Sequence, residues 1–145
     1  MDWGEYLMGF AQHAAEKSKD PSTKVGAVLV RDKVVLCTGF NGLPRGVKDT
    51  AARYERPTKY LYVAHSEANC LMTAAREGIH VEGCDLYVTH EPCSGCAKLI
   101  AQAGIRKVVV GPGKTNMPAE EFEASRIILE EAGVAVCHKK GANDV

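Results

Sequence analysis

The stretch from residue 84 to residue 111 restricts the fold more than any other part of the chain. It reads CDLYVTH, then EPCSGCAKLIAQAG, then IRKVVVG, which is a strand pattern, a helix pattern and a second strand pattern. Pro92 suits the first turn of this helix and Gly104 its C-terminal cap. Short connections between strand, helix and strand imply two parallel strands joined by a right-handed crossover. We therefore expect helices to cover this half of the sheet.

The rest of the chain adds further strands and helices in alternation. Apolar residues at helical spacing between Trp3 and Ala14 predict a first helix. The runs VGAVLV and VVLCTGF, joined by RDK, predict a hairpin of two strands. Residues 64–78 predict an alanine-rich helix, and residues 117–138 predict a last helix and a last strand. The prediction is an α/β fold, with a mixed sheet of about five strands between helical layers, in a single domain spanning residues 1–145.

Composition narrows the class of protein. The chain is 46% hydrophobic and 25% charged, and its 18 basic residues balance 18 acidic ones. Such a balance argues against a broad surface for binding nucleic acid. The first twenty residues carry acids and glycines where a signal peptide needs a basic start and an apolar stretch, so we expect a cytoplasmic protein with no membrane association. In that reducing compartment the six cysteines are expected to be thiols or metal ligands.

Two short motifs carry the candidate chemistry. Cys93 and Cys96 lie at i and i+3 of a predicted helix start, so their sulfurs share one face and the helix N-terminus favours thiolates. This arrangement suits zinc, and it also suits a redox pair. His65 and Glu67 begin another predicted helix, where both can reach one site. One His and two Cys leave zinc a ligand short of four, which is typical of a catalytic site with a water at the open position.

Taken together, H-x-E followed by P-C-x-x-C resembles the signature of zinc nucleobase deaminases. The resemblance implies that His65, Cys93 and Cys96 bind Zn²⁺, which makes hydroxide available near neutral pH. It also implies that Glu67 is the catalytic residue that carries protons from this water to the ring nitrogen and the leaving ammonia. A structural zinc module that only ties two helices together is the non-enzymatic alternative. Such a module has no use for an acid beside the open position.

Longer segments resemble the deoxycytidylate (dCMP) deaminase family. They are SKDPSTKVGAVLV, TGFNGLPRG, YERPTKYLYVAHSEAN and LYVTHEPCSGCAKLIAQAGIRKVVV, from about Lys17 to Val110. The resemblance implies a three-layer α/β/α cytidine-deaminase-like fold, one catalytic Zn²⁺ per subunit, and conversion of dCMP to dUMP and ammonia in pyrimidine nucleotide metabolism. It further implies a homohexamer, activated by dCTP, with which Mg²⁺ is expected to bind, and inhibited by dTTP.

Two positions depart from the family pattern. Ser66 stands where the family usually has Ala, and His90-Glu91 stands where it usually has an apolar pair such as Leu-Phe. The second departure resembles the EPC of tRNA adenosine deaminases, which leaves open whether the cytosine carries a substituent at C5. A tRNA adenosine deaminase and a free cytidine deaminase are the alternative enzymes. The acidic segment 118–133 argues against the tRNA enzyme, which needs a basic surface.

Substrate and effector contacts are expected in loops. Ser22 and Lys24 precede the first predicted strand, where a hydroxyl and an ammonium can meet the substrate phosphate. One or two of the basic residues that flank the predicted pocket are expected to touch this phosphate; the set is Lys24, Arg45, Lys48, Arg53, Arg56 and Lys59. The resemblance implies that Asn41 approaches the deoxyribose hydroxyl. It also implies an allosteric nucleotide site in the loop of Gly39, Phe40, Asn41, Gly42 and Arg45, although GFNGLPRG alone is equally typical of a turn after a strand.

Overall fold

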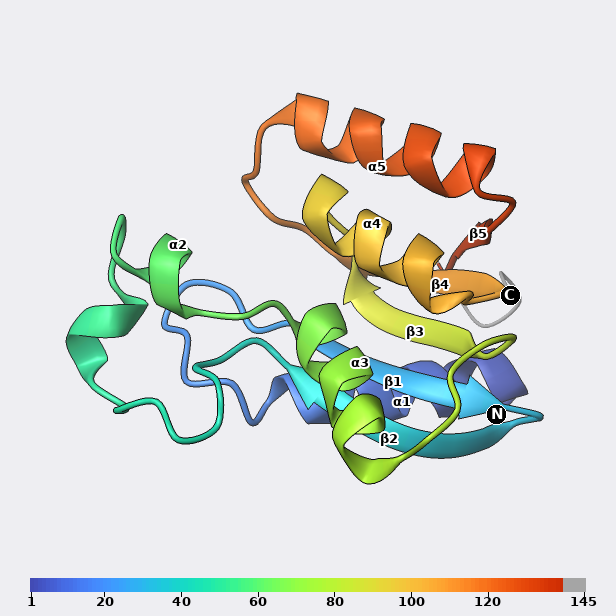
Figure 1. Ribbon diagram of the computed structural model, residues 1–145, viewed down its shortest axis with the longest axis horizontal. Helices are drawn as coiled ribbons and strands as arrows, with labels where there is room; N and C mark the ends of the chain where they lie inside the picture. Colours follow the sequence, from blue (N-terminus) through green and yellow to red (C-terminus); the bar gives the residue numbers. More distant parts are fainter. Residues whose placement is uncertain (140–145) are drawn as a thin grey trace.

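The computed structural model describes residues 1–139. Within them, a five-stranded sheet with the order β2-β1-β3-β4-β5 lies between helices on its two faces (Figure 1). This confirms the predicted α/β class and mixed sheet. The strands are β1 (Gly26–Arg31), β2 (Val34–Phe40), β3 (Asp85–His90), β4 (Lys107–Gly113) and β5 (Ala135–His138). The helices are α1 (Trp3–Ala15), the 3₁₀ helix η1 (Ala51–Tyr54), α2 (Lys59–Tyr62), α3 (Ser66–Glu77), α4 (Ser94–Ala103) and α5 (Ala119–Glu131).

The strand pairing follows the two patterns found in the sequence. β1 and β2 form the predicted antiparallel hairpin, and its turn places Asp32 and Lys33 at positive φ. β3 and β4 are parallel and are joined through α4, as predicted for the crossover. β5 pairs in parallel with β4, and β1 pairs antiparallel with β3, so the sheet is mixed.

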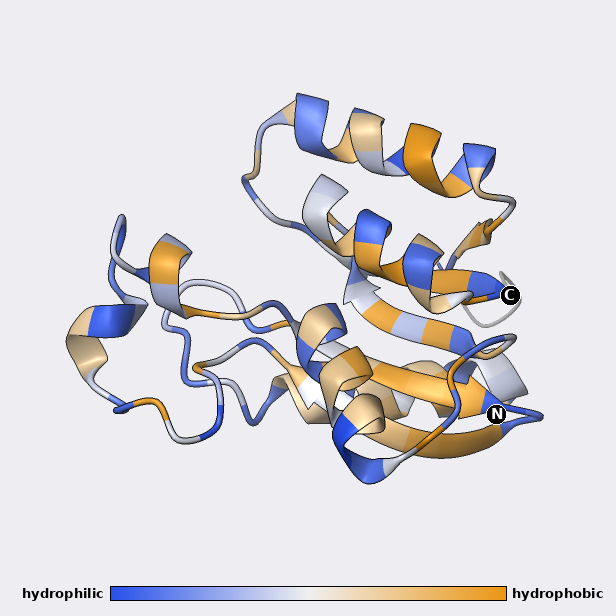
Figure 2. Ribbon diagram, viewed as in Figure 1, coloured by the Kyte–Doolittle hydropathy of each residue, from blue (hydrophilic) through white to orange (hydrophobic). Residues whose placement is uncertain are grey.

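The central strands are buried on both faces, which is why they read as continuous apolar runs. On one face, Leu7, Met8 and Ala11 of α1 pack against β1, β3 and β4. On the other face, apolar residues of α3, α4 and α5, such as Ile100 and Leu129, pack against the same strands. Figure 2 shows the hydrophobic residues concentrated in the strands. Each fully buried large aliphatic side chain contributes about 1.5–3 kcal/mol to the free energy of unfolding.

The ends of α3 and α4 are well defined. Gly78 and Gly104 terminate α3 and α4 in the left-handed conformation that glycine adopts most easily, as the sequence predicted. Pro92 precedes α4 instead of lying in its first turn, because Cys93 is the N-cap. The segment between β2 and α3, which carries η1 and α2, extends beyond the end of the sheet where α3 and α4 begin (Figure 1). None of the helices in residues 1–139 has the length and apolar character that crossing a membrane requires.

A glycine in β2 allows α3 to approach the sheet closely. A Cβ atom at Gly39 would lie 2.5 Å from the Cys70 nitrogen and 2.5 Å from the Ser66 carbonyl oxygen, both in the backbone of α3. Backbone atoms cannot move aside as a flexible side chain can. The absence of a side chain at position 39 therefore fixes how α3 lies on the sheet.

We predict that Gly39→Ala lowers the free energy of unfolding by about 1–3 kcal/mol, because the added methyl group must displace the backbone of α3. Gly9→Ala is the matched control. Gly9 lies inside α1 and has nothing within 4 Å of an added Cβ, so this change should stabilise the protein by up to about 1 kcal/mol. Chemical denaturation of both variants measures the difference. Equal stability of the two variants would contradict the close approach at Gly39.

Candidate metal centre and its cavity

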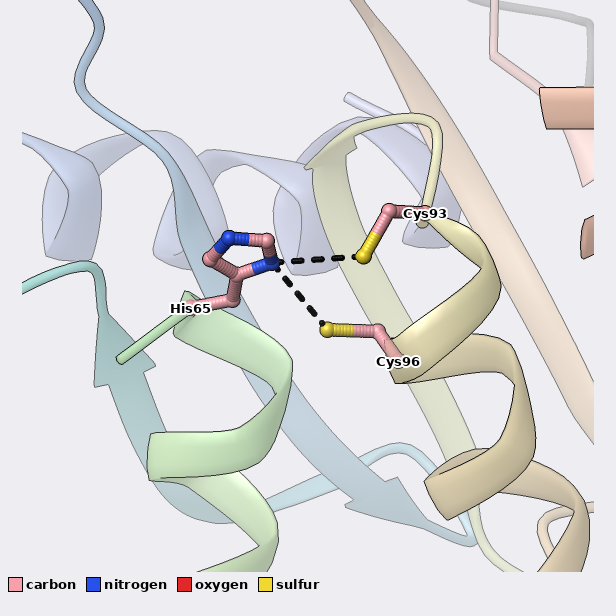
Figure 3. Close-up of side chains that lie close together, drawn as sticks. All are labelled: His65, Cys93 and Cys96. Carbon is pink, nitrogen blue, oxygen red and sulfur yellow. Dashed lines mark hydrogen bonds between the residues drawn. The ribbon is translucent and has the colours of Figure 1, made fainter. Parts of the chain in front are cut away.

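Three metal-binding side chains meet where α3 and α4 begin (Figure 3). His65 is the N-cap of α3 and Cys93 is the N-cap of α4, whereas Cys96 lies in the first turn of α4. The Nδ1 atom of His65 is 3.3 Å from the Cys93 Sγ atom and 3.5 Å from the Cys96 Sγ atom. All three potential ligand atoms lie within 4.8 Å of one another. The structure thus brings together the two motifs that the sequence places 28 residues apart.

The geometry and the donor types of this cluster fit Zn²⁺. Zinc bonds of about 2.3 Å to sulfur and 2.0–2.1 Å to nitrogen, at tetrahedral angles, separate neighbouring ligand atoms by roughly 3.5–3.8 Å. The distances from His65 to the two sulfurs are close to that range. Two thiolates and one imidazole are also the donor types that zinc prefers, and they leave a fourth position for a water or a substrate.

The two thiols differ in acidity because one donates a hydrogen bond to the other. The pKa of Cys93 falls to about 4, through the hydrogen bond from Cys96 and, next, the one from His65. The pKa of Cys96 is raised, because its thiol is the donor and because it is buried. The pKa of His65 is raised in turn by its hydrogen bond to Cys93. A cation held by the three groups would replace these shared protons and stabilise both sulfurs as thiolates.

Beside the cluster is a cavity of about 400 Å³, within the range of small-molecule sites. Its wall includes His65, Glu67 and Cys93. Other parts of the wall come from the segment before β1, from the end of β2, from α2 and from the β4–α5 loop. The cavity therefore opens at the carboxyl end of β3, which is where α/β sheets commonly bind ligands.

Glu67 lies in the cavity wall with its side chain almost completely buried. Its exposed fraction is 4%, and Oε1 accepts a hydrogen bond of 2.7 Å from the Ser66 hydroxyl. Burial raises the pKa of Glu67 above its ordinary value, although the Ser66 hydrogen bond acts in the opposite direction. A carboxyl group with a raised pKa can both accept and donate a proton closer to neutral pH. The arrangement can thus perform acid–base chemistry beside the three residues that would hold a metal ion.

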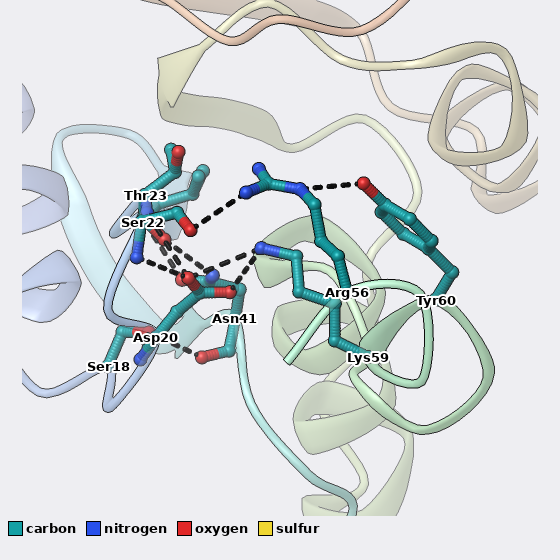
Figure 4. A network of polar contacts seen from close by, with 9 residues as sticks. Ser18, Asp20, Ser22, Thr23, Asn41, Arg56, Lys59 and Tyr60 are labelled. Atoms are coloured by element: carbon teal, nitrogen blue, oxygen red, sulfur yellow. Dashed lines mark hydrogen bonds and ion pairs between the residues drawn. The ribbon is translucent and has the colours of Figure 1, made fainter. Parts of the chain in front are cut away.

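A buried ion pair forms another part of the cavity wall (Figure 4). The Nζ atom of Lys59 lies 3.0 Å from Oδ2 of Asp20, and both side chains are almost fully buried. Burial alone would raise the pKa of Asp20, but N–H groups of Ser22 and Thr23 and the Lys59 ammonium hold it below its ordinary value. The loop before β1 is therefore tied to α2, which carries Lys59.

Arg56 adds a second positive charge to the wall. Its guanidinium donates hydrogen bonds of 2.7 Å to the Tyr60 hydroxyl and 3.1 Å to the Ser22 hydroxyl. Arg56, Lys59 and Tyr60 all line the cavity and come from one short segment. Asp20 also lines the cavity and neutralises Lys59, so the positive charge that suits a phosphate group comes from Arg56.

The expected phosphate contact of Lys24 is not supported by its position. Thr23 and Val25 line the cavity, whereas Lys24 and Ser22 do not, and the Lys24 side chain is exposed. In an extended segment successive side chains point to opposite sides, so Lys24 faces away when its two neighbours face inward. Ser22 lies nearby through its hydrogen bond from Arg56. The phosphate contacts expected of Ser22 and Lys24 stay predictions, and the outward position of Lys24 does not favour its contact.

Asn41 lines the cavity, as expected, and its side chain holds the loop before β1. The Nδ2 atom donates to the Thr23 carbonyl at 2.9 Å, and Oδ1 accepts from the Val25 N–H at 2.8 Å. The Ser18 hydroxyl donates to the Asn41 carbonyl at 2.8 Å. Through these contacts Asn41 joins the end of β2 to the segment before β1. Its expected contact with a sugar hydroxyl stays a prediction.

The other residues of the expected effector loop contact the fold. Gly39 packs on α3, the Phe40 carbonyl accepts a hydrogen bond from α3, and Arg45 donates one to α3. Gly42 exchanges backbone hydrogen bonds with Ala64, just before α3. The loop is thus joined to the helix that carries Glu67, and its binding of dCTP or dTTP stays a prediction.

Comparison with known proteins agrees with this geometry. The family model described as the cytidine and deoxycytidylate deaminase zinc-binding region matches residues 1–112. The chain belongs to this family. It is 40% identical to mouse deoxycytidylate deaminase over 141 residues, which cover 92% of this chain and 78% of the mouse protein. The human deoxycytidylate deaminase is 38% identical over the same shares of the two chains.

Solved structures of the cytidine and deoxycytidylate deaminase family have the same fold. The dCMP deaminase of cyanophage S-TIM5, solved in complex with dCMP and dUMP, is 29% identical, with a TM-score of 0.75 over 92% of this chain and 94% of the phage chain. A tRNA:A34 deaminase is 26% identical, with a TM-score of 0.63 over 92% of this chain and 91% of its own. The three-layer α/β/α fold predicted from the family resemblance is confirmed.

Some of the cavity residues of this family member carried little or no signal in the sequence. The β4–α5 loop contributes Thr115, Asn116, Met117 and Pro118, which belong to no motif. His90 and Glu91 also line the cavity. The sequence showed this pair to be a departure from the family pattern, but it did not predict that the two residues line the cavity.

We predict that Cys96→Ser abolishes zinc binding, since an uncharged hydroxyl replaces a buried thiolate ligand. Cys137→Ser is the control, because Cys137 lies on β5, outside the cluster. Elemental analysis should find about one zinc per chain in the wild type and in the control, and almost none in Cys96→Ser. Full zinc content in Cys96→Ser would exclude Cys96 as a ligand. A disulfide between Cys93 and Cys96 in active protein would favour the redox alternative.

Proposed function

We propose that the protein is a deoxycytidylate deaminase, which hydrolyses dCMP to dUMP and ammonia. The observation that carries the proposal is a single cavity with His65, Cys93 and Glu67 in one part of its wall and the cations Arg56 and Lys59 in another. A cytosine base and a single phosphate on one small molecule match these two parts. The related enzymes named deoxycytidylate deaminase, and the phage enzyme bound to dCMP and dUMP, support the same substrate.

His65, Cys93 and Cys96 would hold the Zn²⁺ ion. When bound, the ion supplies a Lewis acid that lowers the pKa of water and so provides hydroxide near neutral pH. Glu67 accepts the proton of the attacking water and delivers it to the ring nitrogen of cytosine. It then carries the second proton of that water, from the hydroxyl group now on C4, to the amino group. The C4–N bond breaks, ammonia leaves, and the carbonyl of uracil forms. Burial of Glu67 supports this role, because it keeps the carboxyl group ready to receive a proton.

Arg56 and Lys59 are the proposed ligands of the substrate phosphate. A phosphate monoester carries a charge of about −1.5 to −2 at pH 7, and each charge-assisted hydrogen bond to it contributes roughly 1.5–3 kcal/mol. Lys59 is already oriented by Asp20, and Arg56 by the hydroxyl groups of Tyr60 and Ser22. Preorganised donors lose little conformational freedom on binding, so they favour a nucleotide over a nucleoside.

A polynucleotide substrate fits the molecule less well. The chain has 18 basic and 18 acidic residues, and the helix α5, which follows the β4–α5 loop, carries Glu120 and Glu121 in its first turn. Tracking a nucleic-acid backbone requires concentrated positive charge. The small cavity and its two cations are sufficient for a mononucleotide.

Glu67→Gln should retain zinc but lose turnover of dCMP by about 10⁴-fold or more, since acid–base catalysis contributes roughly 10²–10⁴ and Glu67 serves more than one proton transfer. Gln keeps the size of the side chain but cannot exchange protons in this way. The control is Glu123→Gln, at an exposed residue of α5, which should leave turnover unchanged. Ammonia release and zinc content are measured in parallel. Near-normal turnover of Glu67→Gln would refute the mechanism.

A second prediction follows from the proposed contact between Arg56 and the substrate phosphate. The wild-type enzyme should prefer dCMP over deoxycytidine in kcat/KM, and Arg56→Ala should lower kcat/KM for dCMP by about 10–100-fold while leaving the slow reaction on deoxycytidine unchanged. Lys24→Ala is the control, because Lys24 lies outside the cavity wall and should leave both values near those of the wild type. Loss of the preference in Lys24→Ala but not in Arg56→Ala would reverse our assignment.

A further inference from the structure

Ser66 occupies an unusual position between the metal-binding His65 and the acid Glu67. It is the first residue of α3, and its exposed fraction is 0%. Its Oγ atom lies 2.7 Å from Oε1 of Glu67. An ionised carboxylate can only accept hydrogen bonds, so the Ser66 hydroxyl is the donor. A buried hydroxyl destabilises a protein unless it is hydrogen-bonded, and Glu67 provides this partner.

We propose that Ser66 is a positioning residue for Glu67 in the deamination reaction, an inference that rests on the proposed function. Its hydroxyl binds Oε1 and so fixes the orientation of the carboxyl group. Oε2 is then the oxygen that exchanges protons with the water and the substrate. Without this contact the terminal torsion of a glutamate side chain is broad, so the carboxyl group would populate several orientations.

The backbone around Ser66 makes it a rigid support. The Ser66 carbonyl is packed against Gly39 of β2 so closely that a Cβ atom there would lie 2.5 Å from it. The first turn of α3 is thus held by the sheet, and it cannot shift to follow the glutamate. A donor on such a fixed backbone holds its acceptor more accurately than one on a mobile loop.

The ordinary role of a serine at a helix start is to cap the helix, and this role does not account for Ser66. The N-cap of α3 is His65, which makes no side-chain capping bond. Among the hydrogen bonds of the described residues, that of the Ser66 hydroxyl goes to Glu67 and not to a backbone N–H group of the first turn. The hydroxyl therefore serves the carboxyl group.

Ser66→Ala tests the proposal. We expect kcat for dCMP to fall about tenfold, which corresponds to losing one hydrogen bond to a charged group, while KM changes by less than about twofold. Zinc content should remain at that of the wild type. Ser125→Ala is the matched control: Ser125 is also buried in a helix, but it lies in α5 and its hydroxyl has no partner among the described residues. This control should leave kcat and KM unchanged.

A double-mutant cycle separates positioning from a general structural role. If Ser66 acts through Glu67, Ser66→Ala should cause no further loss of turnover in a Glu67→Gln background, because the proton transfer that it assists is already absent. A further tenfold loss in that background, an unchanged kcat in Ser66→Ala alone, or a loss of zinc would each overturn the proposal. A wild-type protein that releases no ammonia from dCMP would instead refute the proposed function.

Discussion

The convergence of two helix N-termini at the carboxyl end of β3 is the constraint on which the site depends. It places the Nδ1 atom of His65 3.3 Å from the Cys93 sulfur and 3.5 Å from the Cys96 sulfur, at positions where the helix dipoles favour negative charge. The convergence is possible because Gly39 lets α3 lie directly on β2, while α4 follows β3 through a short connection that ends at Cys93. At this end of the cavity the pKa of Cys93 is lowered to about 4, whereas the region near α2 holds Arg56 and the ion pair of Lys59 with Asp20. In the proposed function the phosphate of the nucleotide binds near Arg56, away from the metal ligands.

The fold and the chemical centre could be predicted from the sequence because both depend on local patterns. Alternating strand and helix runs determine the crossover, and the spacing of His65, Cys93 and Cys96 at two helix starts determines the metal ligands. The residues that line the cavity before β1 could not be predicted one by one. In an extended segment the side chains point alternately to opposite sides. A shift of this alternation by one residue would turn Lys24 toward the cavity and turn Thr23 and Val25 away from it. The contribution of the β4–α5 loop depends on tertiary packing alone. The hexamer, the effectors and the cellular location stay predictions.

The two departures from the family pattern both lie in the cavity wall. Ser66 donates a hydrogen bond directly to the carboxyl group of Glu67, the proposed catalytic residue. His90 lies against Gly113 and shares a hydrogen bond with Thr89, and Glu91 accepts one of 2.8 Å from Arg126 on α5. Burial lowers the pKa of His90, so its ring is neutral at physiological pH. The hydrogen bonds of His90 and Glu91 offset the cost of placing these polar groups next to the apolar core.

The most direct test of the central claim is a crystal structure of the zinc-loaded protein with dUMP, measured at the zinc absorption edge. We predict one anomalous peak bonded to Nδ1 of His65 and to the sulfurs of Cys93 and Cys96, with the uracil ring beside Glu67 and the phosphate bound by Arg56. Zinc at another set of ligands, or a nucleotide with its phosphate at the metal, would contradict the account.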